Sequence, residues 1–373
     1  MKKYILITII ILILITTVGA ISQKTNKDTI KIGFIGALSG DGAAYGETEK
    51  NTTEIAINEI NNSGGIKGRK IEIIYEDGKC SGKDATNAIY KLINIDKVNI
   101  ILGGTCSSET LAIAPIAEQN KILLLSAFSS NPTITNAGDY IFRNSPSDSD
   151  VAKLDAHTIA SKYKTVAMLS ENTDYSQGVH TIMNKIFQDK GITVVSDEVY
   201  TSGTKDFRSV LIKMKETNPE VMYINPGTDI KAGGLIVKQA RELGIKVPIH
   251  GNLNLATTDA IVAGGEFMNG VVSDDSTGLS NKGNALLKKY ISIYGKAPSI
   301  EFEMGAAYDR VYIIKNAIES VGTDPTNIKN YLYKITDFDG ALGKYHFDSN
   351  GDVVGIGFMN IVLQDGNKIP YNQ

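Results

Sequence analysis

The chain has 373 residues, of which 42% are hydrophobic and 21% are charged, and its net charge is −3. This length suits two domains, or one domain with substantial insertions. The composition predicts a folded globular body. A nucleic-acid partner is not expected, because the chain has no basic excess to neutralise phosphates. A small ligand or a protein partner is the better expectation.

The N-terminal segment differs from the rest of the chain. Two lysines precede an apolar run from Tyr4 to Val18, and small residues up to Ala20 lead into a polar stretch. This pattern is typical of a secretory signal peptide over residues 1–20, cleaved after Ala20. The run of about 15 residues is shorter than the roughly 20 that span a bilayer, and an uncleaved anchor is the alternative. Both interpretations predict an exported body, periplasmic or on the extracytoplasmic face of the membrane.

The first part of the body alternates strands with helices. Apolar runs at 30–35, 70–78, 98–104 and 121–130 predict strands, and the segments between them, at 44–62, 84–93 and 107–119, have helical patterns. Apolar strands interleaved with helices predict a parallel sheet that is covered on both faces. This is a doubly wound α/β arrangement.

The same rhythm begins again after residue 150. Strands are predicted at 165–170, 192–200 and 221–225, and helices at 151–162, 176–189, 205–216 and 231–243. Helical patterns return at 281–294 and 303–320, and residues 340–369 predict two or three strands with the turn "SNGD". The fold class is therefore α/β, with two doubly wound parallel-sheet lobes.

Ligands of open parallel sheets gather beyond the carboxyl ends of the strands. The stretches that fall there are "GALSGDGAAYG" (36–46), "GGTCSSE" (103–109), "SAFSSNP" (126–132), "SENTDYSQG" (170–178) and "NPGTD" (225–229). Tyr45 and Tyr175 lie on two of these loops; each could be a surface residue or could close an apolar pocket across a cleft.

Several chemistries are not supported by the motifs. A dinucleotide fingerprint would need glycine where Tyr45 stands, and no P-loop occurs, so no cofactor is expected. The two cysteines and the four histidines have no metal-ligand spacing. A hydrolase that paired Ser107 with His157 or His180 would need a nucleophile elbow, which is missing.

Cys106, Ser107 and Ser108 stand at a predicted strand-to-helix turn. Cys106 could be a nucleophile, but outside the cell Cys80 and Cys106 most simply form one disulfide, whose sulfur cannot attack. The serines could cap the helix, or Ser107 could donate its hydroxyl and backbone N–H to a carboxylate. Ser129 and Ser130, at a neighbouring strand end, leave the same alternatives open.

The body resembles a known family from Ile30 to about Ile369. The stretches "GGIKGRKIE", "GTCSSETLAIAPIAE", "SSNP", "KQARELG", "AAYDRVY" and "FDGALGKYHFDSNGD" occur in the order and spacing of the branched-chain amino acid (Leu/Ile/Val) binding proteins of ABC importers, which are type I periplasmic binding proteins. The resemblance implies two α/β lobes, joined by three hinge crossings, that close on a small-molecule ligand, with ABC permease subunits as partners. It implies a transport role and not an enzyme.

The resemblance also implies boundaries and roles. Crossings are expected near Ser145, Ser273 and Asp348, which gives an N-terminal lobe of 29–145 plus 274–347 and a C-terminal lobe of 146–273 plus 348–373. Carried over by position, Cys80 would pair with Cys106. The implied ligand-binding residues are Ser107 and Ser130 for the carboxylate, the carbonyl of Phe128 for the ammonium, and Tyr45 and Tyr175 lining the pocket, with Ser129 as a further ligand-binding residue.

One departure from the family pattern concerns Leu253. The family's amino-acid binders resemble each other in placing an acidic residue near this position, where it pairs with the ligand ammonium. An unpaired ammonium in a closed cleft would cost several kcal/mol. Either another carboxylate substitutes, or the ligand is an amide, urea or a small carboxylic acid. The candidate substitutes are Glu171, Asp229, Asp275 and Glu303. A sensory receptor ectodomain with the same fold is the rival function.

Overall fold

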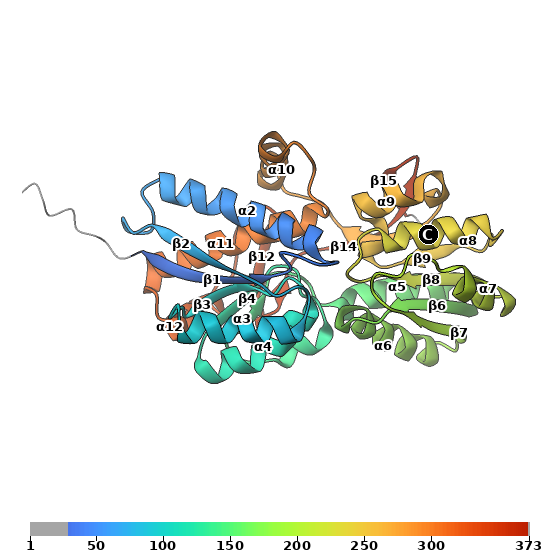
Figure 1. Cartoon of the computed structure of the whole chain (residues 1–373), viewed down its shortest axis with the longest axis horizontal. Coiled ribbons are helices and arrows are strands. Elements are labelled where there is room, and N and C mark those ends of the chain that lie inside the picture. Colours follow the sequence, from blue (N-terminus) through green and yellow to red (C-terminus); the bar gives the residue numbers. More distant parts are fainter. Residues whose placement is uncertain (1–28, 372–373) are drawn as a thin grey trace, which may run out of the picture.

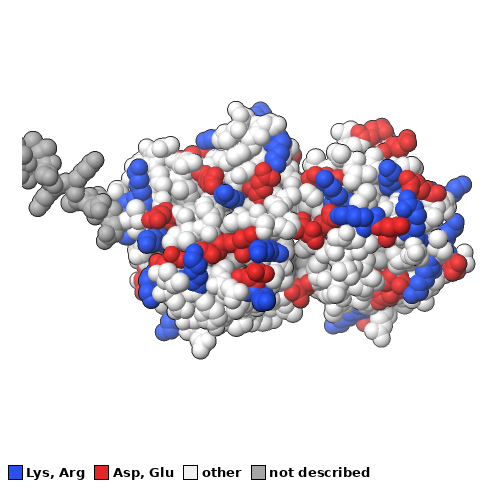
Figure 2. Space-filling view, in the orientation of Figure 1, with Lys and Arg blue, Asp and Glu red and all other residues white. Residues whose placement is uncertain are grey.

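The computed structural model describes residues 29–371, so the predicted signal peptide lies outside the described residues. Within this range, none of the helices combines the length and the apolar character that crossing a membrane requires. The described chain forms two α/β lobes that lie side by side (Figure 1). Lysine and arginine are intermixed with aspartate and glutamate on both lobes on the face shown in Figure 2, where a notch separates the lobes.

The first lobe is built on a parallel sheet in the order β2-β1-β3-β4-β5. Its strands are β1 (Ile30–Gly36), β2 (Ile71–Asp77), β3 (Ile100–Gly103), β4 (Leu123–Ser126) and β5 (Ile141–Arg143). The sheet is buried on both faces, which explains the continuous apolar runs. One face packs on α2 (Ala43–Asn62), α11 (Glu301–Val321) and α12 (Pro325–Leu332), and the other on α3 (Gly82–Asn94) and α4 (Ser107–Asn120).

Two smaller units complete this lobe. Helix α10 (Asn281–Tyr294) packs on α2 and α11 through Leu286 and Tyr290. An antiparallel sheet of β11 (Phe338–Gly340), β12 (Gly343–Phe347) and β13 (Val353–Val354) joins the core through Tyr345 and Phe347.

The second lobe has the sheet order β15-β14-β10-β9-β8-β6-β7. Its strands are β6 (Thr165–Glu171), β7 (Thr193–Tyr200), β8 (Val221–Asn225), β9 (Ile249–Gly251), β10 (Val272–Ser276), β14 (Phe358–Gln364) and β15 (Asn367–Pro370). The first five are parallel, and β14 and β15 run antiparallel at one edge. Helices α5 (Asp148–Lys162) and α6 (Asp174–Asp189) cover one face, and α7 (Arg208–Glu216), α8 (Ala232–Glu242) and α9 (Thr258–Gly264) cover the other.

The chain passes between the two large units three times, at 144–147, 277–280 and 355–357. The lobe boundaries expected from the sequence stay a prediction. They place residues 274–276 in the N-terminal lobe and residues 353–354 in the C-terminal lobe. In the structure, residues 274–276 pair with β14 of the second lobe, and residues 353–354 pair with β12 of the first. The C-terminal segment holds more strands than the two or three predicted. The strands are separated at Gly343 (φ +93°) and at Gly355 (φ +111°), which adopt backbone conformations that other residues rarely reach.

Candidate functional site

The loops that follow the strands of both lobes meet in the space between them. A first cavity is lined by Thr105, Cys106, Ser107, Ser108 and Phe128 from the first lobe and by Thr173, Asp174, Tyr175, Gly227, Thr228 and Asn254 from the second. The stretches 103–109, 126–132, 170–178 and 225–229, which the sequence placed at strand ends, therefore contribute to one space. The interlobe location agrees with the rule that ligands bind beyond the carboxyl ends of parallel strands.

Ser107 is the first residue of α4, and the N-cap position belongs to Cys106. Ser107 is 2% exposed, and its hydroxyl accepts a hydrogen bond from the backbone N–H of Asn131 at 3.3 Å. Because the oxygen is the acceptor in this bond, the hydroxyl hydrogen can still point to an anion. The first turn of a helix also presents free N–H groups and a partial positive charge. This end of the cavity is therefore suited to a carboxylate.

The neighbouring hydroxyls have other partners. Ser108 donates to the carbonyl of Cys80 at 2.7 Å, so it does not cap α4. Ser129, which is 1% exposed, donates to the carbonyl of Gly104 at 2.9 Å and lies 2.7 Å from the hydroxyl of Thr110. Ser129 therefore ties two strand ends of the first lobe together and lines neither interlobe cavity.

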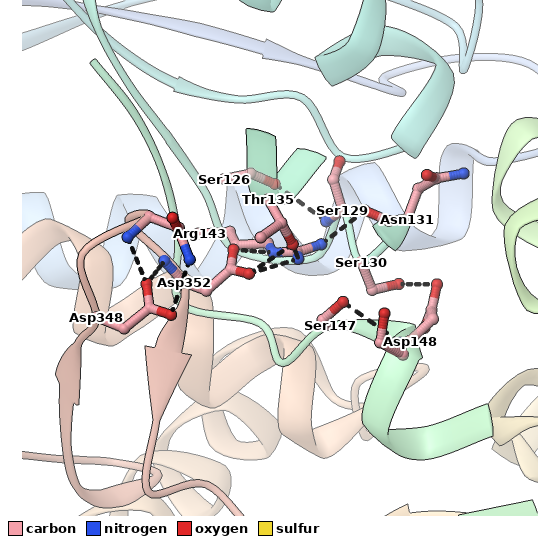
Figure 3. Close-up of polar contacts among 12 residues, drawn as sticks. Ser126, Ser129, Ser130, Asn131, Thr135, Arg143, Ser147, Asp148, Asp348 and Asp352 are labelled. Atoms are coloured by element: carbon pink, nitrogen blue, oxygen red, sulfur yellow. Dashed lines mark hydrogen bonds and ion pairs between the residues drawn. The ribbon is translucent and has the colours of Figure 1, made fainter. Parts of the chain in front are cut away.

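Ser130 lies at a second cavity, adjacent to the first. Its hydroxyl donates to Oδ2 of Asp148 at 3.0 Å, which is visible in Figure 3. Burial raises the pKa of Asp148 to about 7, although the Ser130 bond and the charge of Arg143 oppose this shift. The complete lining is Phe128, Ser130, Ser145, Pro146, Asp148, Val151, Tyr175, Leu253, Asp274, Phe302 and Phe358.

Aromatic side chains connect the two cavities. Phe128 and Tyr175 line both, and the ring of Tyr45 lies 5.4 Å from that of Phe128. The Tyr45 hydroxyl donates across the lobes to the carbonyl of Gly227 at 3.2 Å. The first turn of α2 packs closely against the chain that follows β1, because Gly46 has no side chain. A Cβ on Gly46 would lie 1.8 Å from the carbonyl oxygen of Ala37. This close packing places the neighbouring Tyr45 at the cavities. Burial raises the pKa of Tyr45 and of Tyr175 well above the usual value, so both hydroxyls stay protonated.

Two of the candidate ammonium partners lie in the second lobe, one at the end of β6 and one in the loop after β8. Glu171 is fully buried and accepts from the backbone N–H groups of Gly227 (2.7 Å) and Thr228 (3.1 Å) and from the Thr228 hydroxyl (2.6 Å). It therefore holds in place the loop that lines the first cavity. Asp229 forms an ion pair with Lys205 and accepts from the backbone of Lys231, and it lines neither cavity.

The other two candidates lie outside both cavities as well. Asp275 forms an ion pair with Lys368 at 2.7 Å on the edge of the second sheet. Glu303 is fully buried between α2 and α11, and the charges that act on it are those of Glu49 and Arg310. Burial raises the pKa of Glu303 well above its usual value.

Comparison with protein-family models gives a match to the periplasmic binding protein family over residues 29–362. The chain belongs to this family. The matched range covers the first lobe, all three crossings and the second lobe as far as residue 362 of β14. The two-lobed type I periplasmic-binding fold expected from the sequence is therefore confirmed.

Individual relatives agree with this membership. A leucine-, isoleucine-, valine-, threonine- and alanine-binding protein of Pseudomonas aeruginosa is 29% identical, over 91% of each chain. The solved structure of the branched-chain amino acid transporter substrate-binding protein LivJ from Streptococcus pneumoniae, in complex with isoleucine, is 28% identical with a TM-score of 0.82, and the match covers 91% of this chain and 98% of that one. The leucine-binding protein LivK from Thermotoga maritima is 26% identical with a TM-score of 0.82, over 92% and 98%.

The disulfide of this periplasmic binding protein supports the carboxylate end of the first cavity. Cys80 and Cys106 are bonded, as expected, and Cys106 lines that cavity. Buried Glu109 accepts from the backbone N–H of Cys80 at 3.0 Å and of Cys106 at 2.9 Å, which holds both halves of the bridge. Burial raises the pKa of Glu109 to about 7.

Reduction of this bridge should destabilise the protein. Closing a loop of this length contributes about 3.5 kcal/mol on the chain-entropy model. We expect mass spectrometry without reductant to find the Cys80–Cys106 bridge, and dithiothreitol to lower the Tm. Free thiols in the purified, unreduced protein would contradict this prediction.

Two acidic residues of the site were missed by the sequence reasoning. Asp148 and Asp274 both line the second cavity, together with Leu253. A signal for Asp274 existed, because a buried strand that carries two successive aspartates is unusual. Of these two aspartates, only Asp275 was among the residues predicted from the sequence.

Proposed function

We propose that this chain is an exported solute-binding protein that captures a small amino acid, in the first place a branched-chain one, and delivers it to an ABC permease. One observation carries the proposal: Ser107, at the start of α4 in the first lobe, and Tyr175, in the second lobe, line the same interlobe cavity. The family membership and the amino-acid-binding relatives support it.

The two-lobed arrangement suggests how capture works. A ligand whose carboxylate rests at Ser107 would contact both lobes, and closure is favoured by the difference in its affinity for the closed and open forms. Contacts between the lobes already exist without ligand atoms: Tyr45 donates to Gly227, and Asn131 Nδ2 donates to the carbonyl of Asp174 at 2.5 Å. Ligand contacts would add to these and select the closed form.

The cavity walls favour a ligand that is polar at one end and apolar at the other. Phe128, Tyr175 and Leu253 offer apolar surface next to the helix terminus, which suits an aliphatic side chain. Burying such a side chain contributes about 1.5–3 kcal/mol. The role is one of binding; the energy for uptake would come from the ATPase of the importer.

Ligand screening by calorimetry and thermal shift tests the proposal. L-Leucine, L-isoleucine and L-valine should each raise the Tm of the purified body, because a ligand that binds only the folded form contributes about 2.7 kcal/mol at a hundredfold excess over its Kd. Benzoate, acetamide and urea serve as the comparison set. A rise with one of these and with no amino acid would overturn the amino-acid assignment.

A further inference from the structure

The second cavity, lined in part by Ser130, Leu253 and Asp274, has an acidic wall. Asp148, which follows the first crossing, and Asp274, on strand β10, both line this cavity. No lysine or arginine is among its lining residues. Because Phe128 and Tyr175 line both cavities, this acidic wall is adjacent to the space at Ser107. One end of the interlobe space therefore suits an anion, and the other end suits a cation.

Asp274 is the acidic residue of this cavity that no cation neutralises. It is fully buried, and its carboxylate oxygens accept from no N–H group and no hydroxyl group of residues 29–371. Its hydrogen-bond partner is the carboxyl group of Asp155, and this bond needs one proton between the two acids. None of the ion pairs of residues 29–371 involves it, whereas its neighbour Asp275 pairs with Lys368. Successive residues of a strand point to opposite faces, so Asp274 and Asp275 have different surroundings.

The groups that face Asp274 do not neutralise it. Asp155 and Asp148 approach from α5, Asp275 lies on the same strand, and the hydroxyl-bearing neighbours are Tyr175 and Tyr223. Asp155 has its own donors, the Tyr223 hydroxyl at 3.0 Å and Asn360 Nδ2 at 2.8 Å.

The protonation of this acidic group follows from its burial. Burial and the adjacent carboxylates raise the pKa of Asp274 well above its usual value, and burial raises the pKa of Asp155 to about 7. An ionised and unpaired carboxylate here would cost several kcal/mol. The site therefore retains a proton near neutral pH unless a cation replaces it.

We propose that Asp274 binds the positively charged amine of the ligand. This inference rests on the proposed function and deepens it: the acidic residue missing at position 253 is supplied by the strand β10, whose Asp274 lines the same cavity as Leu253. The ligand is then a zwitterion, with its carboxylate at Ser107 and its amine at Asp274. Figure 3 shows the hydrogen bond from Ser130 to Asp148, and both residues line this cavity, so Ser130 serves the cationic end.

The first test compares Asp274→Asn with the adjacent Asp275→Asn. Asparagine resembles the protonated aspartate in shape, so Asp274→Asn should fold and keep its Tm. We expect it to weaken L-isoleucine binding at least tenfold, since a charge-assisted bond in a desolvated site is lost. Asp275→Asn should bind within about threefold of the wild type. Equal affinities for Asp274→Asn and the wild type would overturn the inference and leave the proposed function standing.

The second test uses only the wild type, and so it does not depend on how a variant folds. Because the amine replaces the proton that Asp274 shares with Asp155, binding should release about one proton. The affinity for L-isoleucine should rise as the pH goes from about 6 to about 8, on either side of the pKa of about 7 that burial gives Asp155. Calorimetry in two buffers of different ionisation enthalpy measures the release. An affinity that does not change over this range, with no proton released, would contradict the role of Asp274.

L-Lysine distinguishes the source of the amine. If the α-ammonium is bound, L-isoleucine binds more tightly than L-lysine. The wild type then binds the 2-oxo acid analogue of isoleucine at least tenfold more weakly than L-isoleucine, and Asp274→Asn does not show this difference between the two ligands. If a side-chain amine is bound, L-lysine is the tighter ligand and loses affinity in Asp274→Asn; this outcome supports the inference and corrects the branched-chain assignment. A wild type that binds neither amino acid would overturn both proposals.

Discussion

Ser107→Ala is expected to weaken the binding of L-isoleucine or L-leucine at least tenfold. A hydrogen bond to a charged group contributes about 1.5–3 kcal/mol, and here the hydroxyl lies at the first turn of α4, where the helix N–H groups already favour an anion. Ser107 is 2% exposed, so water has little access to take the place of its hydroxyl. Isothermal titration calorimetry of the wild type and the variant measures the change.

The same variant should lose little stability. The Ser107 oxygen accepts from the backbone N–H of Asn131 at 3.3 Å, and removing this long bond costs about 1 kcal/mol, or about 2–4 °C in Tm without ligand. Ser129→Ala is the matched control: its buried hydroxyl contacts only protein groups, so it should lower the Tm and leave the affinity within about threefold. If Ser129→Ala lost affinity and Ser107→Ala did not, the anion site would be wrongly placed.

The fold could be predicted from the sequence because apolar runs report burial on both faces of a parallel sheet. The meeting of the strand-end stretches in one interlobe cavity followed as well, since strand ends of a doubly wound sheet lie on one edge and Ser107 stands at a strand-to-helix turn. Both predictions depend on a repeating pattern along the chain, which a single sequence contains.

Pairs of identical neighbours could not be resolved in this way. In Ser129-Ser130 and in Asp274-Asp275 one member lines the second cavity and the other contacts different groups. Which member points inward is set by how the strand or loop meets the rest of the fold, and a shift of one residue exchanges them. The sequence alone also cannot show that Asp274 on β10 takes the place of an acid near Leu253, because these two residues come together only in the folded chain.

Asp352→Ala is expected to destabilise the protein by about 3 kcal/mol. Arg143, at the end of β5, is fully buried and donates to both carboxylate oxygens of Asp352, from Nε at 2.6 Å and from Nη2 at 2.9 Å. The ion pair joins the end of β5, directly before the first crossing, to the segment before β13, which leads into the third crossing. Figure 3 shows the pair next to the loop that carries Ser130. Removing the carboxylate leaves a buried charge without compensation, which is the most costly way to break such a pair.

Thermal unfolding and urea titration of Asp352→Ala should show this loss, with the Tm lowered by at least about 5 °C. Lys344→Ala removes an ion pair with Asp337 in which both side chains are more than half exposed, and it should leave the Tm nearly unchanged because solvent screens such pairs. Arg143→Met combined with Asp352→Ala removes both charges and should recover part of the loss, although Arg143 also donates to the carbonyl of Asn131 at 2.8 Å. If Asp352→Ala were as mild as Lys344→Ala, the pair would contribute nothing to holding the two crossings together.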